Sequence, residues 1–511
     1  MKRICRMLAA MMLMTLLAGC ACGEAAEDYT ADWKDFPTAA APARVSVHDP
    51  SIVAADGQYY IFGTHMTAAV SEDLRSWKMK ADGYVPANKV WGNIFGADSH
   101  VFDYAGSAKS VIPTDDGKYH LWAPDVIYND TMGKYMMYYC TSSTWNASNL
   151  CFAISDSVEG PYTWQGALIY SGFDRETIEA TDVRQYADEE WIAKHYLIAG
   201  GGYNFNQVPN ALDPSVFYDE NHRLWMVYGS WSGGIFLLEL DPATGLVIHP
   251  EADEEAGIDP YFGKKLMGGN HQSIEGPYIQ YDPEAGWYYL FVSYGSLTAH
   301  GGYQIRVFRS RTPDGEYEDM KGKHPGTHSH ARYGLKLSGN YILPSVQTAY
   351  MATGHNSALI DADGKRYVCC HTRFDSGSEH HVPLVRQYGI NEEGWPCLLP
   401  YATRGETIPA ALDPQEVPGR YYVINQGTKI NDQIAEPQVL YLRKDGSIGG
   451  ETLSGSWTLK EGSVFLHLTL GEAEYSGILC RMQDDAGTDV QVFSAVGQNE
   501  SLWGVRYPEG A

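Results

Sequence analysis

The chain has 511 residues, of which 63 are acidic and 37 are basic, so its formal net charge is −26. A chain of this length can bury a large core and has room for more than one domain. Because nucleic acid binding needs a cationic surface, this charge argues against a nucleic acid partner. Aromatic residues make up 13% of the chain. Tyr and Trp offer flat apolar faces that suit sugar rings, although most are expected to pack between strands.

The N-terminus has the form of an export signal over residues 1–20. Three basic residues precede an apolar stretch at 7–17, and LAGC follows, with the form of a bacterial lipobox that ends at Cys20. The apolar stretch is too short to span a bilayer. Resemblance to lipoprotein signals implies an extracellular or cell-surface protein whose contact with the membrane is a lipid on Cys20. Ordinary signal-peptidase cleavage at 21–25 is the alternative. Residues 21–43 lack periodicity and are expected to form a linker.

A hairpin pattern then recurs five times. Its clearest copy is NALDPSVFYDENHRLWMVYGSW at 210–231, where one acid precedes a short strand, a polar turn and an aromatic-rich strand. Similar units begin at residues 48, 123, 274 and 354. The polar residues that lead the five hairpins are Asp49, Asp125, Asp213, Glu275 and His355.

Each hairpin is followed by a second repeated pattern, which begins at residues 67, 150, 234, 303 and 382 and gives a strand, a turn and the start of another strand. A hairpin and its companion make a four-stranded antiparallel sheet. Irregular repeats of four strands are typical of a β-propeller, whose innermost strands surround a central channel. The sequence therefore predicts an all-β fold with a five-bladed β-propeller over residues 44–405.

The repeat ends near residue 401. Short strands separated by GTKIND, KDGSIGG, KEGS and QDDAGTD fill the segment 411–511. This spacing predicts a small antiparallel β-barrel or sandwich. No acid pair in a hairpin context occurs there, so we expect this domain to have a packing or accessory role.

If all five inner strands begin at the same end of the propeller, their leading polar residues converge. Any one of them alone could be an ordinary turn or cap residue. A ring of acids is unfavourable unless a substrate, a metal or a proton uses it. Two carboxyl groups across a pocket are the minimum for glycoside hydrolysis, because one must donate a proton and the other must be ionised. A third acid can keep the donor protonated.

The motifs at these five positions are HDPS, WAPDV, ALDPSVFYDENHRLWMVYGSWSGGIF, IEGPY and GHNSALID. Together they resemble the motifs of the family-43 glycoside hydrolases, and the resemblance covers about residues 44–405. Within that family, the chain is most similar to the endo-acting α-1,5-L-arabinanases. The segment after residue 411 resembles the C-terminal module of larger extracellular arabinanases more weakly.

The resemblance implies an inverting mechanism, with Asp49 as general base, Glu275 as general acid and Asp213 as the residue that raises the pKa of the acid and orients it. An inverting pair stands about 6.5–9.5 Å apart. The resemblance also implies a calcium ion in the central channel beside His355, ligated mostly by water. Calcium prefers oxygen ligands, so from the residues alone a structural role for His355 is the alternative.

Other residues near these motifs are candidates for substrate contact. Asp125 matches no catalytic position and is expected at the rim of the site. Trp122 is a possible stacking face for a sugar, with packing between blades as the alternative. Most of the other histidines, including His371, are expected to be ordinary hydrogen-bonding or surface residues. Residues that flank the Asp213 hairpin are expected to bind sugar hydroxyls: Asn210, Ser230, Trp231 and Ser232.

Three functions remain open. The first is endo-hydrolysis of α-1,5-L-arabinofuranosidic bonds in arabinan and arabino-oligosaccharides. The second is an exo-acting α-L-arabinofuranosidase or β-xylosidase of the same family, because insertions at 82–117 and 171–209 are able to shape the site either way. The third is a non-catalytic glycan-binding surface lipoprotein, which would be expected to lack at least one of the three acids, and all three are present.

Overall fold

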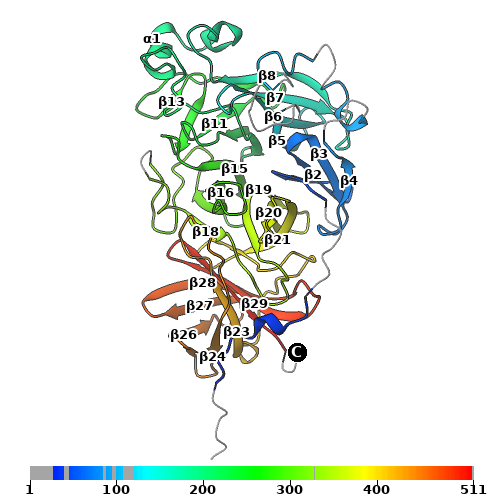
Figure 1. The fold of residues 1–511 in the computed structure, drawn as a ribbon, viewed down its shortest axis with the longest axis vertical. Helices are drawn as coiled ribbons and strands as arrows, with labels where there is room; N and C mark the ends of the chain where they lie inside the picture. Colours follow the sequence, from blue (N-terminus) through cyan, green and yellow to red (C-terminus); the bar gives the residue numbers. More distant parts are fainter. Residues whose placement is uncertain are drawn as a thin grey trace, which may run out of the picture.

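The computed structural model of the chain describes residues 27–38, 45–83, 88–94, 99–106, 120–326 and 329–508. The described part consists of five β-sheets, which form a propeller, and a closed β-barrel (Figure 1). The export signal and Cys20 lie outside the described residues. Within them, no helix combines the length and the apolar character needed to cross a membrane.

The five repeats form five antiparallel sheets, blades 1 to 5, as predicted. Four blades have four strands in chain order, and blade 3 has six strands. The strands are β1 (Ser51–Ala55), β2 (Gln58–Gly63), β3 (Thr67–Ser71) and β4 (Lys78–Ala81); β5 (Leu121–Asn129), β6 (Lys134–Ser142), β7 (Ser148–Ser155) and β8 (Thr163–Ser171); β9 (Ser215–Tyr218), β10 (Leu224–Tyr228), β11 (Ile235–Leu240), β12 (Val247–Ile248), β13 (Ile258–Asp259) and β14 (Gly263–Met267); β15 (Ile274–Asp282), β16 (Trp287–Tyr294), β17 (Gln304–Ser310) and β18 (Leu335–Ser338); and β19 (Tyr350–Ile360), β20 (Arg366–Phe374), β21 (Val382–Ile390) and β22 (Pro396–Leu398).

Helical structure in the described residues is limited to short turns. α1 (Glu189–Trp191) continues into a π-helical turn (Ile192–Tyr196), where Asp188 caps the helix by accepting a hydrogen bond from the Trp191 amide. The 3₁₀ turns are Trp33–Asp35, Thr64–Met66, Lys89–Trp91, Ile178–Ala180, Val183–Gln185 and Pro414–Glu416.

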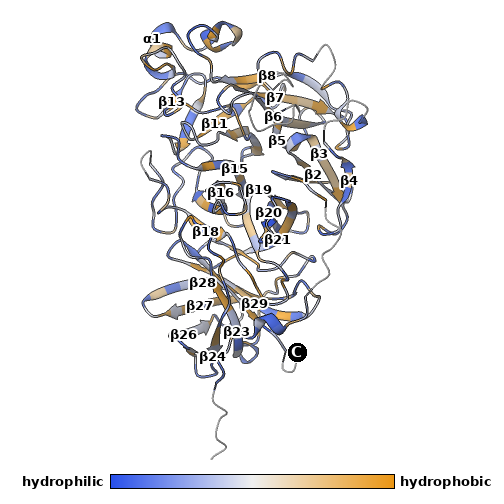
Figure 2. Ribbon diagram, viewed as in Figure 1, coloured by the Kyte–Doolittle hydropathy of each residue, from blue (hydrophilic) through white to orange (hydrophobic). Residues whose placement is uncertain are grey.

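The innermost strands β1, β5, β9, β15 and β19 each contact their neighbours, and β19 closes the ring against β1. The second strand of each blade is covered on both faces, so it reads as an almost continuous apolar run, such as WYYLFVSY in β16. Figure 2 shows apolar residues concentrated along strands such as β7 and β19, and hydrophilic residues in most connecting loops. This packing places the first ends of the inner strands together at one end of the propeller axis.

Each inner strand has a residue with left-handed backbone in or just before its first half, and β19 has a second one at Ala352. These equivalent residues, which we call apex residues, are Asp49 (φ 52°), Ala123 (φ 42°), Asp213 (φ 54°), Gly276 (φ 55°) and His355 (φ 45°). Left-handed backbone costs a residue other than glycine about 1–2 kcal/mol. This comparison of the five blades corrects the equivalent positions that the sequence predicted for blades 2 and 4. The apex of blade 2 is Ala123, two residues before Asp125, and the apex of blade 4 is Gly276, one residue after Glu275.

Polar side chains two residues beyond the apex join neighbouring inner strands. Ser51 Oγ donates to Asp125 Oδ1 at 2.5 Å, and Asp125 Oδ2 accepts from the Val216 amide at 2.7 Å. At the same position of blade 5, Ser357 Oγ accepts from the Ile52 amide at 3.0 Å. Asp125 is 4% exposed, and burial raises its pKa to about 6. The prediction of a rim residue is therefore wrong for Asp125, because this carboxyl group lies deeper and links three blades.

The C-terminal domain is a closed antiparallel barrel of eight strands, in which β23 pairs with β30. The sequence did not distinguish a barrel from a sandwich. Closure of the barrel leaves no exposed sheet edge. The barrel shares one hydrophobic cluster with blades 4 and 5, in which Ile424 and Trp503 lie with Phe291 and Tyr388. Its strands are β23 (Gly419–Asn425), β24 (Gln438–Leu442), β25 (Ser447–Gly450), β26 (Ser454–Leu459), β27 (Phe465–Leu470), β28 (Ala473–Gln483), β29 (Asp489–Gly497) and β30 (Glu500–Arg506).

Residues 27–38, inside the predicted linker 21–43, pack on the outside of this barrel. Trp33 is 8% exposed and lies in a cluster with Tyr422 and Val439. Burying a tryptophan removes a large apolar surface from water, which holds the segment in place. This part of the chain is therefore a docked extension of the barrel and not a free linker.

Candidate active site

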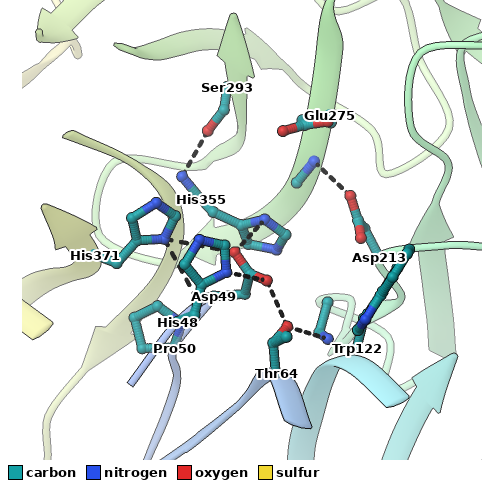
Figure 3. Close-up of polar contacts among 12 residues, drawn as sticks. His48, Asp49, Pro50, Thr64, Trp122, Asp213, Glu275, Ser293, His355 and His371 are labelled. Atoms are coloured by element: carbon teal, nitrogen blue, oxygen red, sulfur yellow. Dashed lines mark hydrogen bonds and ion pairs between the residues drawn. The ribbon is translucent and has the colours of Figure 1, made fainter. Parts of the chain in front are cut away.

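Four side chains converge at one end of the propeller axis, and we call them the axial site: Asp49, Asp213, Glu275 and His355. Figure 3 shows the three carboxyl groups around the ring of His355. Two of the acids stand two residues before β1 and β9, the third is the second residue of β15, and the histidine lies within β19. The structure thus brings together four of the five polar residues that were expected to meet.

Asp49 is an ionised carboxylate held by three side chains. His48 Nδ1 lies 2.7 Å from its Oδ2, His355 Nδ1 lies 3.0 Å from its Oδ1, and Thr64 Oγ1 donates to Oδ2. Burial alone would raise the pKa of Asp49. The positive charges of His355 and His48 and the hydrogen bonds outweigh burial and hold the pKa well below its usual range. A carboxylate in this state is able to accept a proton from water.

His371 completes the environment of Asp49 as a neutral ring. The Asp49 amide donates to His371 Nδ1 at 3.3 Å, so this nitrogen carries no proton. Burial lowers the pKa of His371 well below its usual range. The 3.4 Å distance between the same nitrogen and Asp49 Oδ1 is therefore not an ion pair. Sequence reasoning missed His48, Thr64 and His371. His48 has no equivalent in the other four repeats. Thr64 follows the second strand of blade 1, and His371 lies in the second strand of blade 5.

Asp213 holds a proton near neutral pH. Burial raises its pKa to about 7; His355 lowers it, the charges of Glu275 and Asp49 raise it, and the Gly276 amide, which donates to Oδ2 at 3.2 Å, lowers it. The resemblance implied that Asp213 keeps the proton on Glu275. Burial and the charges of Glu275 and Asp49 also raise the proton affinity of Asp213 itself, so this carboxyl group takes part in holding the proton.

Glu275 is oriented by two donors from the loop after β10. Ser230 Oγ donates to Oε2 at 3.1 Å, and Trp231 Nε1 donates to the same oxygen at 2.8 Å. Trp231 has left-handed backbone, with φ of 51°. Because both donors bind Oε2, a proton on Glu275 would lie on Oε1. The structure therefore gives Ser230 and Trp231 a contact with this carboxyl group, where the sequence predicted contacts with sugar hydroxyls.

Asn210 and Ser232 are buried and hold this loop in place by hydrogen bonds. Asn210 is 3% exposed; its Oδ1 accepts from the Ser230 amide at 2.8 Å, and its Nδ2 donates to the Trp145 carbonyl at 3.1 Å. Ser232 is 1% exposed and donates to Asn146 Oδ1 at 3.4 Å. The prediction of direct sugar contacts does not fit either residue, since their polar atoms are buried and bound to the protein.

Two tryptophans near the axial site stay candidates for substrate contact, although Trp122 also packs against the hydrophobic cluster shared by blades 2 and 3. Trp122 is half-buried, and it immediately precedes the apex of blade 2, the position that Glu275 has in blade 4. Trp145 is 54% exposed, and its carbonyl binds Asn210 in the layer behind the Glu275 loop. The sequence pointed to Trp122. It gave no signal for Trp145, whose loop carries no repeat motif.

A five-bladed propeller whose axis holds an ionised carboxylate, a protonated carboxyl group and a third carboxyl group oriented by two donors is equipped for glycoside hydrolysis. The model of glycosyl hydrolases family 43 matches residues 187–396, and the model of the C-terminal lipocalin-like domain of this family matches residues 400–504. The second match agrees with the closed barrel.

Relatives of known activity match almost the whole chain. The extracellular endo-α-(1→5)-L-arabinanase of Thermotoga petrophila is 37% identical over 91% of this chain and 94% of its own length. The extracellular endo-α-(1→5)-L-arabinanase 2 of Bacillus subtilis is 36% identical over 90% of this chain and 92% of its own. The crystal structure of the Thermotoga petrophila enzyme superposes with a TM-score of 0.79 over 92% of this chain and all of that one. The chain belongs to glycoside hydrolase family 43.

The proton on Asp213 predicts a pH-dependent stability. An unfolded Asp has a pKa of about 3.9, so the folded chain binds this proton more tightly, and the free energy of unfolding falls as pH rises from about 4 to about 7. Asp213→Asn removes this contribution. We expect the melting temperature of the variant, relative to the unmodified protein, to rise by several degrees between pH 4 and pH 7 and to stay constant above.

Thermal unfolding at five pH values from 4 to 8 measures this difference. Asp56→Asn, at an exposed turn, is the matched control and should give a difference that does not vary with pH. A pH-independent difference for Asp213→Asn would contradict the assignment of the proton.

Proposed function

We propose that the protein is an inverting endo-arabinanase that hydrolyses internal α-1,5-L-arabinofuranosidic bonds in arabinan. The observation that carries this proposal is the division of labour in the axial site. Asp49 is held ionised, while Asp213 and Glu275 form a neighbouring pair that holds a proton. Two relatives that match at least 90% of the chain are named as endo-arabinanases, which supports the choice of substrate and of endo action.

In this mechanism a water molecule attacks the anomeric carbon and gives its proton to Asp49. The bond to the leaving oxygen breaks, and that oxygen takes the proton of Glu275, so the product has inverted configuration. Asp213 raises the proton affinity of the pair because it is buried beside Glu275, so that two negative charges would repel each other there. Solvent exchange then returns a proton to Glu275 and removes one from Asp49.

The ring of His355 favours the separation that inversion requires. One side of the ring binds Asp49 through Nδ1. The ring also lies against Gly276, where a Cβ would be 3.0 Å from Cγ of His355 and 3.1 Å from Nδ1, so a larger residue next to Glu275 would press on the ring. An imidazole between base and acid keeps the two carboxyl groups apart, in the sense expected for a pair that leaves room for water. The separation of about 6.5–9.5 Å stays a prediction.

The time course of products from linear arabinan tests the function. An endo enzyme cuts internal bonds, so viscosity should fall steeply while few reducing ends appear, and oligosaccharides should precede arabinose. Asp49→Ala, which lacks the base, should release neither under the same conditions. Arabinose released at nearly constant viscosity would favour the exo-acting alternative, and no product from arabinan or xylan would favour a glycan-binding protein.

We propose an extracellular location with an anchor at Cys20. The LAGC motif supports it, and the two arabinanases compared above are named as extracellular. Metabolic labelling with palmitate in a bacterial host should mark the full-length protein. Cys20→Ala should remove the label and release the protein to the medium, and a label that survives this change would contradict the anchor.

We also propose a calcium ion beside His355, ligated mostly by water. Burial lowers the pKa of His355, but the charges of Asp49, Asp213 and Glu275 outweigh burial and raise it, so the site favours a positive charge. The protein offers an imidazole nitrogen there, which suits calcium poorly, so water must supply most ligands. A bound calcium ion would supply positive charge that orders water near the carboxyl groups.

Removal of metal with EDTA should lower the melting temperature by several degrees and reduce activity, and calcium should restore both better than magnesium. His355→Ala should lose this response in melting temperature. Metal analysis that finds no calcium in the purified protein, together with an unchanged melting temperature in EDTA, would sink the proposal.

A further inference from the structure

A cavity of about 570 Å³ lies between blade 4 and the barrel, outside the axial site. Its volume falls in the range of about 300–1,000 Å³ that is usual for ligand pockets. Three of the residues that line it are cationic and none is acidic: Lys321 and Arg332 come from the propeller, and Lys429 comes from the barrel. In a chain with a net charge of −26 this is an unusual concentration of positive charge.

Two more cations lie behind the wall of the cavity. Arg306 is fully buried and donates to the carbonyl of Thr428, and Lys336, which is 6% exposed, donates to the carbonyl of Lys429 at 3.3 Å. Neither forms an ion pair with a carboxylate among the residues that the structure describes. Burial lowers the pKa of Arg306 to about 10 and that of Lys336 to about 7. A nearby anion would stabilise both charges.

The backbone of the wall also presents donors. Because the carbonyls of Thr428 and Lys429 point toward the buried cations, the amide N–H groups that follow them in the same planar trans peptides, on Lys429 and Ile430, point the opposite way. These two residues line the cavity. Successive N–H groups beside cationic side chains form a concave anion site.

The propeller residues that line the cavity are connected to the part of the axial site that contains Glu275. Arg332 stands two residues after His330, whose Nε2 lies 2.9 Å from Ser273 Oγ. Ser273 precedes Glu275 by two residues. The wall that carries Arg332 is thus connected to the strand of Glu275 through the contact between His330 and Ser273.

The barrel residues that line the cavity are connected to the part of the axial site that contains Asp49. Asn431, which lines the cavity, packs on Gly302 so closely that a Cβ on this glycine would lie 2.9 Å from the Asn431 amide nitrogen. The next residue, Tyr303, stacks on His371 with ring centroids 5.7 Å apart. The barrel thus contributes one wall of a basic cavity and, through two contacts, supports the residues around Asp49.

We propose that this cavity binds the carboxylate groups of uronic acid residues, in an acidic polysaccharide that carries arabinan chains. The proposal rests on the proposed function and adds a second binding region to it. Neutral arabinan gives no physical reason for five cations, whereas a uronate segment does. A flat anionic membrane fits less well, because the cations line a concave cavity and the remaining surface is strongly acidic.

The test compares two triple variants of the full-length protein that remove equal charge. The cavity variant is Lys321→Ser, Arg332→Ser and Lys429→Ser. The control variant is Lys78→Ser, Lys444→Ser and Arg481→Ser, all exposed and outside the residues that line the cavity. Trigalacturonate is titrated into each protein by calorimetry at 0.1 M salt. We expect binding to the unmodified protein and to the control, and an affinity at least tenfold lower for the cavity variant.

Equal affinity in all three proteins, or no binding of trigalacturonate, would overturn the proposal. Binding of inorganic phosphate as tight as that of trigalacturonate would reduce the site to an unselective anion site, and binding to phosphatidylglycerol vesicles alone would identify a membrane contact; either result also overturns it.

Hydrolysis separates this inference from the proposed function. Arabinan attached to a uronate-containing backbone should be cut with a KM severalfold lower than that of isolated neutral arabinan, and the cavity variant should lose this preference while keeping its rate on the neutral chain. A protein that cuts neither substrate would refute the proposed function, whereas calorimetry tests the cavity independently of turnover.

Discussion

The left-handed backbone at the first end of each inner strand is the constraint on which the active site depends. At Asp49 and Asp213 the next residue is proline, which fixes the chain on the far side of the apex. Non-glycine residues accept this conformation at a cost, and neighbouring blades offset the cost by binding the apex amides of Asp49, Gly276 and His355. Closure of the propeller and placement of the carboxyl groups therefore depend on the same contacts between blades.

The electrostatics of the site follow from unequal surroundings. Asp49 and Asp213 are equally buried and occupy equivalent positions. Asp49 binds two histidines and is ionised, whereas at Asp213 the charges of Glu275 and Asp49 oppose that of His355 and the carboxyl group holds a proton. Neighbours, and not burial, thus decide which carboxyl group accepts a proton and which side of the site holds one.

Much of this arrangement was predictable from the sequence. The repeat of hairpins gave five blades, and the motifs around Asp49, Asp213, Glu275 and His355 gave the axial site. Register within a strand was not predictable: Asp125 looks like its counterparts, yet a shift of two residues moves it from the axis into the core. Contacts between blades were also hidden, because the pairing of His371 with Asp49 spans the point where the last blade meets the first.

The docking of residues 27–38 on the barrel has a consequence for orientation. Six residues lie between Cys20 and Glu27, and seven Cα–Cα steps in an extended chain reach at most about 25 Å. With a lipid on Cys20, the barrel would lie next to the cell surface and would support the propeller above it. The axial site lies on the propeller and not on the barrel, so it would be held away from the membrane, where a polymer too large to approach the cell closely could still be cut.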